Sequence, residues 1–264
     1  MQTRPPIVVV LGHVDHGKTT LLDAIRSADV ASTEFGGITQ GIGAYQSNGI
    51  TFIDTPGHEA FSTMRSRGAK VADIAILVVA ANDSVMPQTV ESIKIIQEAK
   101  IPYIVAINKV DLPEANVDQV IKYLLRHNVL LENYGGDVPF LKISAKKKQG
   151  IKELLDLISL VAEVNEIKED PDGPLEFADI ESKMDKSRGP VATIIIRNGT
   201  LKIGQEIEID GQKSKVRALI DYQKKNISEA GPGTPVEILG LNNLPTIGAT
   251  TKPVASAEVL NLIL

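Results

Sequence analysis

The residues best suited to chemistry lie in a glycine-rich segment, GHVDHGKTT, at residues 12–20. From Gly12 the spacing reads G-x-x-x-x-G-K-T, and an apolar run, IVVVL, comes directly before it. Such a turn lets backbone N–H groups point at a phosphate, and a helix starting near Lys18 adds its positive end. We expect Lys18 to reach the β- and γ-phosphates of a nucleotide and the Thr19 hydroxyl to bind Mg²⁺. The phosphate site is predicted to consist of Asp15, His16, Gly17, Lys18, Thr19 and Thr20.

A second acidic element follows in ITFIDTPGHEAF, residues 50–61. Asp54 ends an apolar run there, and Gly57 comes three residues later. A carboxylate in this place can hold Mg²⁺ through water. The Gly57 N–H can bond the γ-phosphate, because a residue without a side chain allows that close approach. One strand after a phosphate loop, this pair predicts the metal side of the same site.

The segment AINKVD, residues 106–111, indicates which base is bound. Guanine presents adjacent N1–H and 2-amino donors, and the two oxygens of the Asp111 carboxylate match them. Adenine would leave that carboxylate unpaired, so we expect discrimination of about 10⁴. Asn108 can tie the base and the loop together, and the Lys109 stem can cover the face of the ring.

A further loop, ISAKK, follows the next expected strand at residues 143–147. The Ala145 N–H can donate to guanine O6, a position at which the amino group of adenine would clash. We therefore add Ser144, Ala145 and Lys146 to the predicted guanine site.

The composition restricts the class of protein. The chain has 264 residues, a net charge of −5 and no cysteine. The length favours one large domain or two ordinary ones, and the lack of cysteine excludes disulfides, thiolate zinc sites and cysteine nucleophiles. The negative charge argues against unaided affinity for nucleic acid. Apolar runs are far shorter than the roughly 18 residues of a membrane span, and no signal peptide is visible, so we expect a cytoplasmic protein without a membrane partner.

Apolar runs and helical patterns alternate from Ile7 to about Ala162. The expected strands are IVVVL, GITFID, ADIAILVVA, IPYIVAIN and VPFLKIS. The expected helices include TVESIKIIQEAK, VDQVIKYLLRHN and IKELLDLISLVAEV. This alternation predicts an α/β domain with a mainly parallel sheet and helices on both faces. With the phosphate and guanine motifs described above, we interpret it as an α/β P-loop GTPase domain with a six-stranded sheet. Ligands of such sheets bind at the carboxyl ends of the strands, where the motifs lie.

The pattern changes near Asn165. The charged segment NEIKEDPDGP is typical of a linker, and short strands separated by turns follow it. Asn198-Gly199 and Asp210-Gly211 predict hairpins. Because about 90 residues provide little core for two sheets, we expect a small all-β barrel. The predicted organisation is a GTP-binding domain at 1–165, a linker at 166–173 and a barrel domain at 174–264; the tail SAEVLNLIL fits either a strand or a helix.

The motifs, in this order, resemble those of translational GTPases. GHVDHGKT and DTPGH are similar to translation factors rather than to small signalling GTPases. GGITQGIGAY, VVAANDSVMPQTVESI, SRGPVAT and GPGTPVEILGL extend the resemblance to the bacterial translation initiation factor 2 family, from about Ile7 to about Leu241. The resemblance implies a fragment with the GTPase domain and the following barrel. It also implies a GTP-hydrolysing switch that acts on the ribosome during subunit joining and is stimulated by it.

The resemblance implies further residue roles. Thr39 would close over Mg²⁺ and the γ-phosphate, and His58 would orient the attacking water. Val14 and Ile38 would match the apolar pair that fences this histidine from the phosphate. Asp15 matches a position that helps to bind a monovalent cation in related factors. With these roles the catalytic set is His58, Thr39 and Lys18, and the metal ligands are Thr19, Thr39 and Asp54.

Partners follow from the same resemblance. The ligands would be GTP or GDP with Mg²⁺, and the barrel would contact the small ribosomal subunit. Initiator tRNA binding is expected only in a full-length factor, which has additional N- and C-terminal domains, and the chain is expected to be a monomer. Gly41 departs from the family, which usually carries a histidine there.

Other interpretations stay open at this point. The chain fits a GTP-dependent binding module with incidental hydrolysis, and an elongation-type or selenocysteine-type carrier, although GITQ disfavours the carrier. His13 and His16 fit a structural role as well as a binding role. Arg65 and Arg67 are not assigned to catalysis, and the lysines at 146–148 fit either contact with rRNA or a solvated surface.

Overall fold

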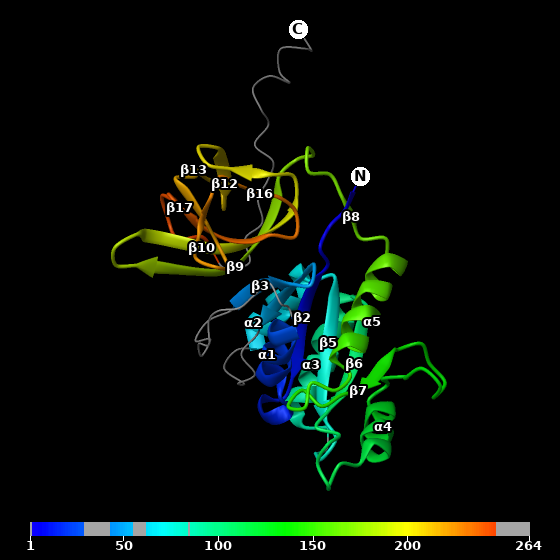
Figure 1. The fold of residues 1–264 in the computed structure, drawn as a ribbon. Coiled ribbons are helices and arrows are strands. Elements are labelled where there is room, and N and C mark those ends of the chain that lie inside the picture. The colour runs from blue at the N-terminus through cyan, green and yellow to red at the C-terminus, as the bar shows by residue number, and fades with distance from the viewer. Residues whose placement is uncertain (1, 29–42, 55–61, 84, 247–264) are drawn as a thin grey trace. The chain divides into compact units, whose positions relative to one another are not determined.

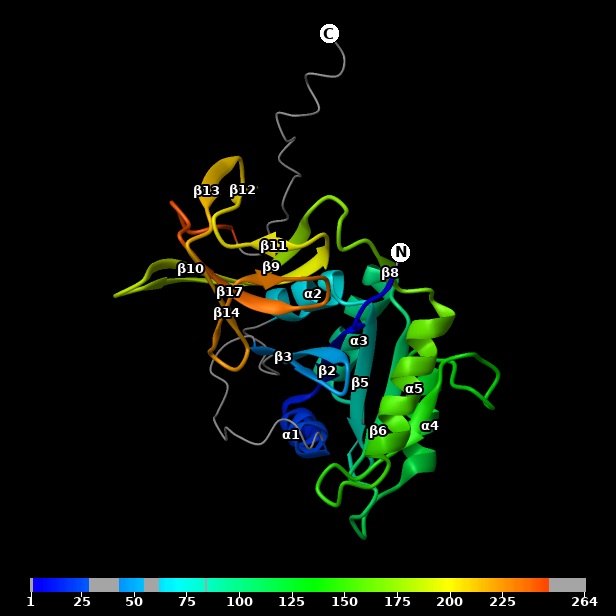
Figure 2. The same cartoon turned by 45° about the horizontal axis from the view of Figure 1, so that its top comes forward.

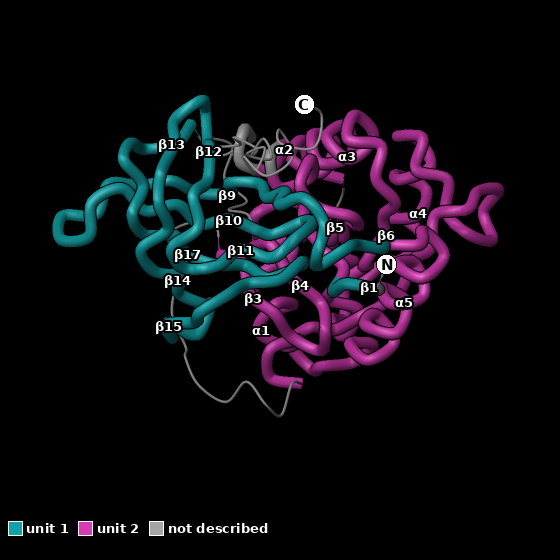
Figure 3. Tube along the Cα trace, turned by 90° about the horizontal axis from the view of Figure 1, so that it is seen from above, with its two compact units in different colours: residues 1–5, 168–264 teal, residues 6–167 magenta. Residues whose placement is uncertain are grey.

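The computed structural model describes residues 2–28, 43–54, 62–83 and 85–246. The chain forms two compact units, residues 6–167 and residues 1–5 together with 168–264 (Figure 3). Strand β1 (Gln2–Thr3) pairs with β8 (Lys168–Glu169), so the first residues belong with the C-terminal half. The domain limits proposed from the sequence, 165 and 173, lie near the change of unit between residues 167 and 168.

The larger unit, residues 6–167, is built on a six-stranded sheet in the order β3-β4-β2-β5-β6-β7 (Figure 1). Its strands are β2 (Ile7–Gly12), β3 (Gly43–Ser47), β4 (Ile50–Asp54), β5 (Ile74–Ala80), β6 (Tyr103–Asn108) and β7 (Phe140–Lys142). Every neighbouring pair is parallel except β3 with β4. All residues of β2 and β5 are buried, as expected for parallel strands covered on both faces. The predicted mainly parallel sheet is confirmed.

The antiparallel edge strand β3 was not expected from the sequence. It forms a hairpin with β4 through Asn48 and Gly49, which have φ values of 52° and 72°. Positive φ at both positions of a two-residue turn is the geometry that an Asn-Gly pair favours. This dipeptide was the signal that could have predicted the strand.

Five helices and one short 3₁₀ turn are described in this unit. They are η1 (Val14–His16), α1 (Lys18–Ala28), α2 (Ser62–Val71), α3 (Pro87–Ala99), α4 (Val117–Arg126) and α5 (Ile151–Val164). Helices α2 and α3 pack on one another, and α1 and α5 lie across the sheet from them (Figures 1 and 2). Among the described helices, none is long and apolar enough to cross a bilayer.

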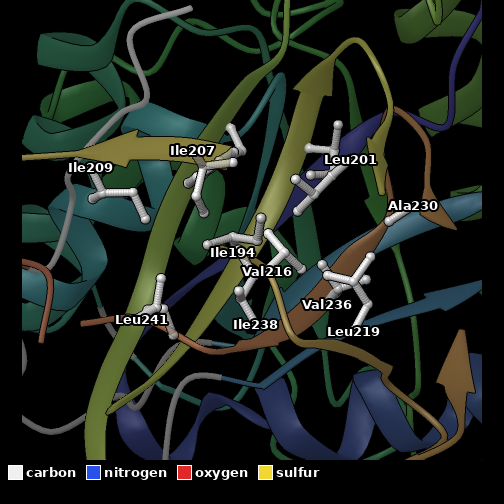
Figure 4. Packing of buried hydrophobic residues seen from close by; sticks show 13 residues of the cluster. Ile194, Leu201, Ile207, Ile209, Val216, Leu219, Ala230, Val236, Ile238 and Leu241 are labelled. Atoms are coloured by element: carbon white, nitrogen blue, oxygen red, sulfur yellow. The ribbon is translucent and has the colours of Figure 1, made fainter. Parts of the chain in front are cut away.

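The smaller unit is an antiparallel, barrel-like domain. A five-stranded sheet in the order β15-β14-β17-β10-β9 is accompanied by the pairs β11-β16 and β12-β13. Its strands are β9 (Glu176–Asp185), β10 (Gly189–Asn198), β11 (Leu201–Lys202), β12 (Glu206–Ile209), β13 (Gln212–Lys215), β14 (Ala218–Asp221), β15 (Asn226–Ile227), β16 (Glu229–Ala230) and β17 (Pro235–Leu239). Aliphatic residues from these strands and from the loops between them, among them Ile194, Leu219 and Ile238, pack together as its core (Figure 4). The predicted all-β second domain is confirmed, and the tail SAEVLNLIL lies outside the described residues.

One of the two predicted hairpins in this domain is wrong. Asp210-Gly211 does join the paired strands β12 and β13. Asn198-Gly199 does not make a hairpin, because β10 pairs with β9 and β17 whereas β11 pairs with β16. The Asn198 amide instead accepts from Asp170 N (3.0 Å) and donates to Pro174 O (2.8 Å). The Asn198 side chain therefore holds the segment that leads into the barrel-like domain, residues 170–174.

A charged network closes the turn between β9 and β10. The Asp185 carboxylate accepts from Ser187 N (2.9 Å) and Arg188 N (2.9 Å), and Arg188 also pairs with Glu237 of β17 (3.1 Å). The hydrogen bonds from Ser187 and Arg188 hold the pKa of Asp185 well below its usual range. Burial acts to raise the pKa of Glu237, but its bonds to Lys224 and Arg188 lower it overall.

These shifts predict a pH-dependent stability. A carboxylate with a lowered pKa stabilises the folded state above its unfolded pKa, and this contribution is lost as the pH falls through the folded pKa. We expect the unfolding midpoint in guanidinium to fall between about pH 5 and pH 3. The double variant Asp185→Asn, Glu237→Gln should flatten that fall, whereas Glu176→Gln, at an exposed position of β9, should not. An unchanged acid dependence in the double variant would contradict the assignment.

Candidate functional site

The phosphate loop connects β2 to α1 through η1 and Gly17. Gly12 has a φ of 140°, and a Cβ placed there would lie 2.3 Å from Val78 O of β5. Gly17 has a φ of 87°, and its Cβ would lie 2.5 Å from the Asn108 side-chain nitrogen. Both glycines are therefore required by the close approach of neighbouring strands and by the backbone conformation. The loop begins where a fully buried strand ends, at the carboxyl edge of the sheet.

Lys18 is folded back over this loop. Its side-chain nitrogen donates to Gly12 O (2.9 Å) and to His13 O (2.6 Å), and only 4% of the residue is exposed. Burial lowers the pKa of Lys18 to about 8. An ammonium has three donors, so these two carbonyls leave one for a phosphate oxygen. A buried cation of this kind gains strongly from a bound anion.

His16 is an internal support of the loop. Its ring is fully buried, Nδ1 donates to Val78 O (3.3 Å), and the His13 ring packs edge-on at 5.0 Å. Burial lowers the pKa of His16 to about 4, so the ring is neutral at physiological pH. The geometry favours a structural role for the side chain, while the backbone of His16 remains part of the phosphate loop.

Asn108 joins three of the four predicted motifs. Its amide nitrogen donates to His16 O of the phosphate loop (2.9 Å). Its amide oxygen accepts from Ala145 N (3.0 Å), and only 2% of the residue is exposed. The end of β6 is therefore hydrogen-bonded both to the loop after β2 and to the loop after β7. Segments that lie more than 120 residues apart in the chain meet at one side chain.

Ser144 makes two hydrogen bonds within the predicted base-binding loop. The Ser144 hydroxyl donates to the Asp111 carboxylate (2.7 Å) and accepts from Lys147 N (3.2 Å). The bond from Ser144 lowers the pKa of Asp111, so this group is an anion at neutral pH. Ser144 and Ala145 are buried, whereas Lys146 is exposed. Lys109 adopts a φ of 63° between Asn108 and the Asp111 turn.

Two of the three predicted metal ligands, Asp54 and Thr19, lie among the described residues. Asp54 ends β4 beside Val10 of β2, and Thr19 is exposed in the first turn of α1. Burial raises the pKa of Asp54 although the charges of Arg26 and Lys18 act against this shift. A half-buried carboxylate and an exposed hydroxyl at the start of a helix fit a Mg²⁺ ion that also contacts phosphate. Among the described residues, no group of three His, Asp or Glu side chains could hold a metal alone.

Five of the predicted residues belong to segments that the structure does not describe. Ile38, Thr39, Gly41, Gly57 and His58 lie outside the described residues. Of the remaining ones, Asp15 and Thr20 are exposed in the loop and at the start of α1.

One hydrogen bond of the phosphate loop was not predicted from the sequence. Val14 N donates to the side-chain oxygen of Gln88 in α3, at 3.2 Å. No role was predicted for Glu91 either, although this residue pairs with the fully buried Arg65 of α2 at 2.6 Å. The pairing gives Arg65 a structural role, and Arg65 was not among the residues predicted to be catalytic. Gln88 stands in the segment MPQT, but no spacing rule relates that segment to residue 14.

The bridge at Asn108 predicts a large effect of its removal. Asn108→Ala deletes two buried hydrogen bonds and leaves His16 O and Ala145 N unpaired, so we expect a loss of about 2–4 kcal/mol in the free energy of unfolding. The control Asn116→Ala removes an exposed helix cap, the bond from Gln119 N at 3.0 Å, and should cost about 1 kcal/mol. Equal losses in chemical denaturation of the nucleotide-free variants would contradict the role given to Asn108.

Comparisons with known proteins agree with this geometry. The family model described as the elongation factor Tu GTP binding domain matches residues 26–163. The model described as elongation factor G domain 2 matches residues 178–252. The two matches fall in the two compact units of the structure.

Individual relatives are translation factors. The chain is 55% identical to translation initiation factor IF-2 of Clostridium novyi (strain NT), over 94% of its own length and 37% of that protein. It is 57% identical to the Halothermothrix orenii factor of the same name, with the same two coverages of 94% and 37%. The chain thus spans little more than a third of the length of these relatives.

Solved structures of translation factors are also similar to this chain. The crystal structure of GDP-bound aIF5B from Aeropyrum pernix superposes with a TM-score of 0.77 at 30% identity, covering 99% of this chain and 56% of that one. The Methanococcus maripaludis elongation factor SelB, in complex with the GTP analogue GppNHp, gives 0.74 at 26% identity, covering 97% and 56%. The resemblance to bacterial translation initiation factor 2, inferred above from the motifs, is confirmed. This chain belongs to the family of the elongation factor Tu GTP binding domain.

Proposed function

We propose that the chain is the GTP-binding and GTP-hydrolysing switch module of a translation initiation factor, which acts on the ribosome during subunit joining. The observation that supports this proposal is the Asn108 bridge, which hydrogen-bonds the loop after β2, the predicted phosphate loop, to the loop after β7, the predicted base loop. The relatives named initiation factor IF-2 support the role in initiation.

The described residues can hold the two ends of a guanine nucleotide. The buried ammonium of Lys18 and the amides of the phosphate loop would neutralise the phosphates. Asp111, ionised and oriented by Ser144, would accept from guanine N1–H and the 2-amino group, and Ala145 N–H would face O6. Phosphoryl transfer needs mainly positioning and charge neutralisation, and these residues can supply both.

The remaining parts of the mechanism follow from the family resemblance. Mg²⁺ would be held by Thr19, Thr39 and, through water, Asp54, and it would add charge neutralisation at the phosphates. His58 would orient the attacking water, and Thr39 and Gly57 would change position with the γ-phosphate. We expect slow hydrolysis by the isolated chain and stimulation by the ribosome, by analogy with switches that gain about 10⁵-fold on activation.

The proposal extends to setting and partners. The barrel-like domain would contact the small ribosomal subunit, and the module would work in the cytoplasm as a monomer. A monovalent cation near Asp15 is part of the same proposal, supported by the exposure of that residue in the loop.

The base contact provides the test. Asp111→Asn replaces a two-oxygen acceptor with an amide, which should lower GTP affinity at least 100-fold and raise the affinity for xanthosine triphosphate, whose 2-carbonyl accepts a hydrogen bond. Both affinities can be measured by fluorescence titration. Asp118→Asn, an exposed residue in the first turn of α4, serves as the matched control. Wild-type GTP affinity in Asp111→Asn would refute the guanine contact.

A further inference from the structure

Helix α3 reaches the phosphate loop through one side chain. Gln88 is the second residue of α3, after Pro87, and its side-chain oxygen accepts from Val14 N at 3.2 Å. Val14 stands in the middle of the loop, and 44% of it is exposed. The residue therefore receives little support from packing, and the hydrogen bond to Gln88 is its described polar anchor.

The other supports of the loop act at different residues. Lys18 bonds the carbonyls of Gly12 and His13. The His16 ring donates to Val78 O of β5, and the His16 carbonyl accepts from Asn108 of β6. These contacts fix the two ends of the loop against the sheet. Gln88 differs because it fixes the middle of the loop to a helix.

The same helix is fastened to α2 by an ion pair. Arg65 of α2 is 0% exposed, and its guanidinium lies 2.6 Å from the Glu91 carboxylate. A buried guanidinium requires such a partner, because an uncompensated buried charge is strongly destabilising. Glu91 follows Gln88 by three residues, so both side chains leave the same face of α3. Polar contacts thus connect α2, α3 and the phosphate loop in series.

We propose that Gln88 is a positioning residue that holds Val14 for nucleotide binding, and that the Arg65–Glu91 pair extends this support to α2. The inference rests on the proposed function, since it assumes that the loop binds the phosphates of a guanine nucleotide. A shift of α2 moves Glu91, and through α3 it moves the acceptor of the Val14 amide. Gln88 acts through the loop backbone and does not itself take part in the chemistry.

The test measures GDP release from the whole chain. Gln88→Met keeps the length of the side chain but removes the acceptor, and it should speed release of a fluorescent GDP about three- to tenfold. Gln97→Met makes the same replacement at an exposed position near the end of α3 and should leave the rate unchanged. The unfolding midpoint of Gln88→Met should equal that of Gln97→Met. A wild-type release rate in Gln88→Met, or a lowered midpoint with no change in release, overturns the proposal.

A double-variant cycle tests the link to α2. Glu91→Gln weakens the pair with Arg65 and should also speed release. If both residues act through α3 on Val14, Gln88→Met combined with Glu91→Gln should release GDP more slowly than the product of the single effects predicts. Simple multiplication of the two effects overturns the α2 link.

Failure of this inference can be told from failure of the proposed function. If the wild-type chain takes up no GDP, the proposed function is wrong. If the wild-type chain binds GDP and Gln88→Met releases it at the wild-type rate, only the role of Gln88 is wrong.

Discussion

Two hydrogen bonds made by the buried Asn108 side chain hold the candidate site together. Its nitrogen bonds the loop that follows β2, and its oxygen bonds the loop that follows β7. Between those strands the sheet runs β2, β5, β6 and β7, so the side chain bridges loops from three of the four strands. Since an amide has one donor group and one acceptor, it can satisfy a carbonyl on one side and an N–H on the other. A carboxylate or an aliphatic residue at this position could not do both.

The candidate site contains two ionisable side chains, Lys18 and Asp54, whose charged forms are disfavoured by burial. Burial lowers the pKa of Lys18 and raises the pKa of Asp54, so both groups are less stable in their charged forms than they would be in water. A phosphate would stabilise the lysine and a divalent cation would stabilise the aspartate. Ionisable residues that the fold removes from water are typical of binding sites. A ligand of opposite charge can stabilise their charged forms in place of the lost water.

Short-range patterns predicted much of the fold and the site. The buried strand before Gly12, the Asn108–Asp111 motif and the helical periodicity of residues 117–128 and 151–164 all depend on nearby residues, and the described elements follow them. The same reasoning overlooked the hairpin at Asn48-Gly49, because β3 is short and lacks a strong apolar alternation. It misassigned Asn198-Gly199, because the side chain of Asn198 makes its bonds to residues 24 and 28 positions earlier.

Contacts between residues far apart in the chain could not be predicted from these short-range patterns. Gln88 and Val14 lie 74 positions apart, and Asn108 and His16 lie 92 positions apart. The AINKVD motif suggested that Asn108 ties the base and a loop together, but it did not indicate His16 as the partner. No sequence rule relates Gln88 to Val14. Packing of α3 against α2 and the sheet brings Gln88 to the loop, and this packing is set by the whole unit rather than by any segment.

We propose that the loops hydrogen-bonded to Asn108 bind both the phosphates and the guanine base of one nucleotide. Calorimetric titration of the nucleotide-free chain with GDP and with ADP, each with Mg²⁺, measures this directly. The account predicts one GDP site per chain and a dissociation constant for ADP that is higher by a factor of about 10⁴. Equal uptake of the two nucleotides, or uptake of neither, would contradict it.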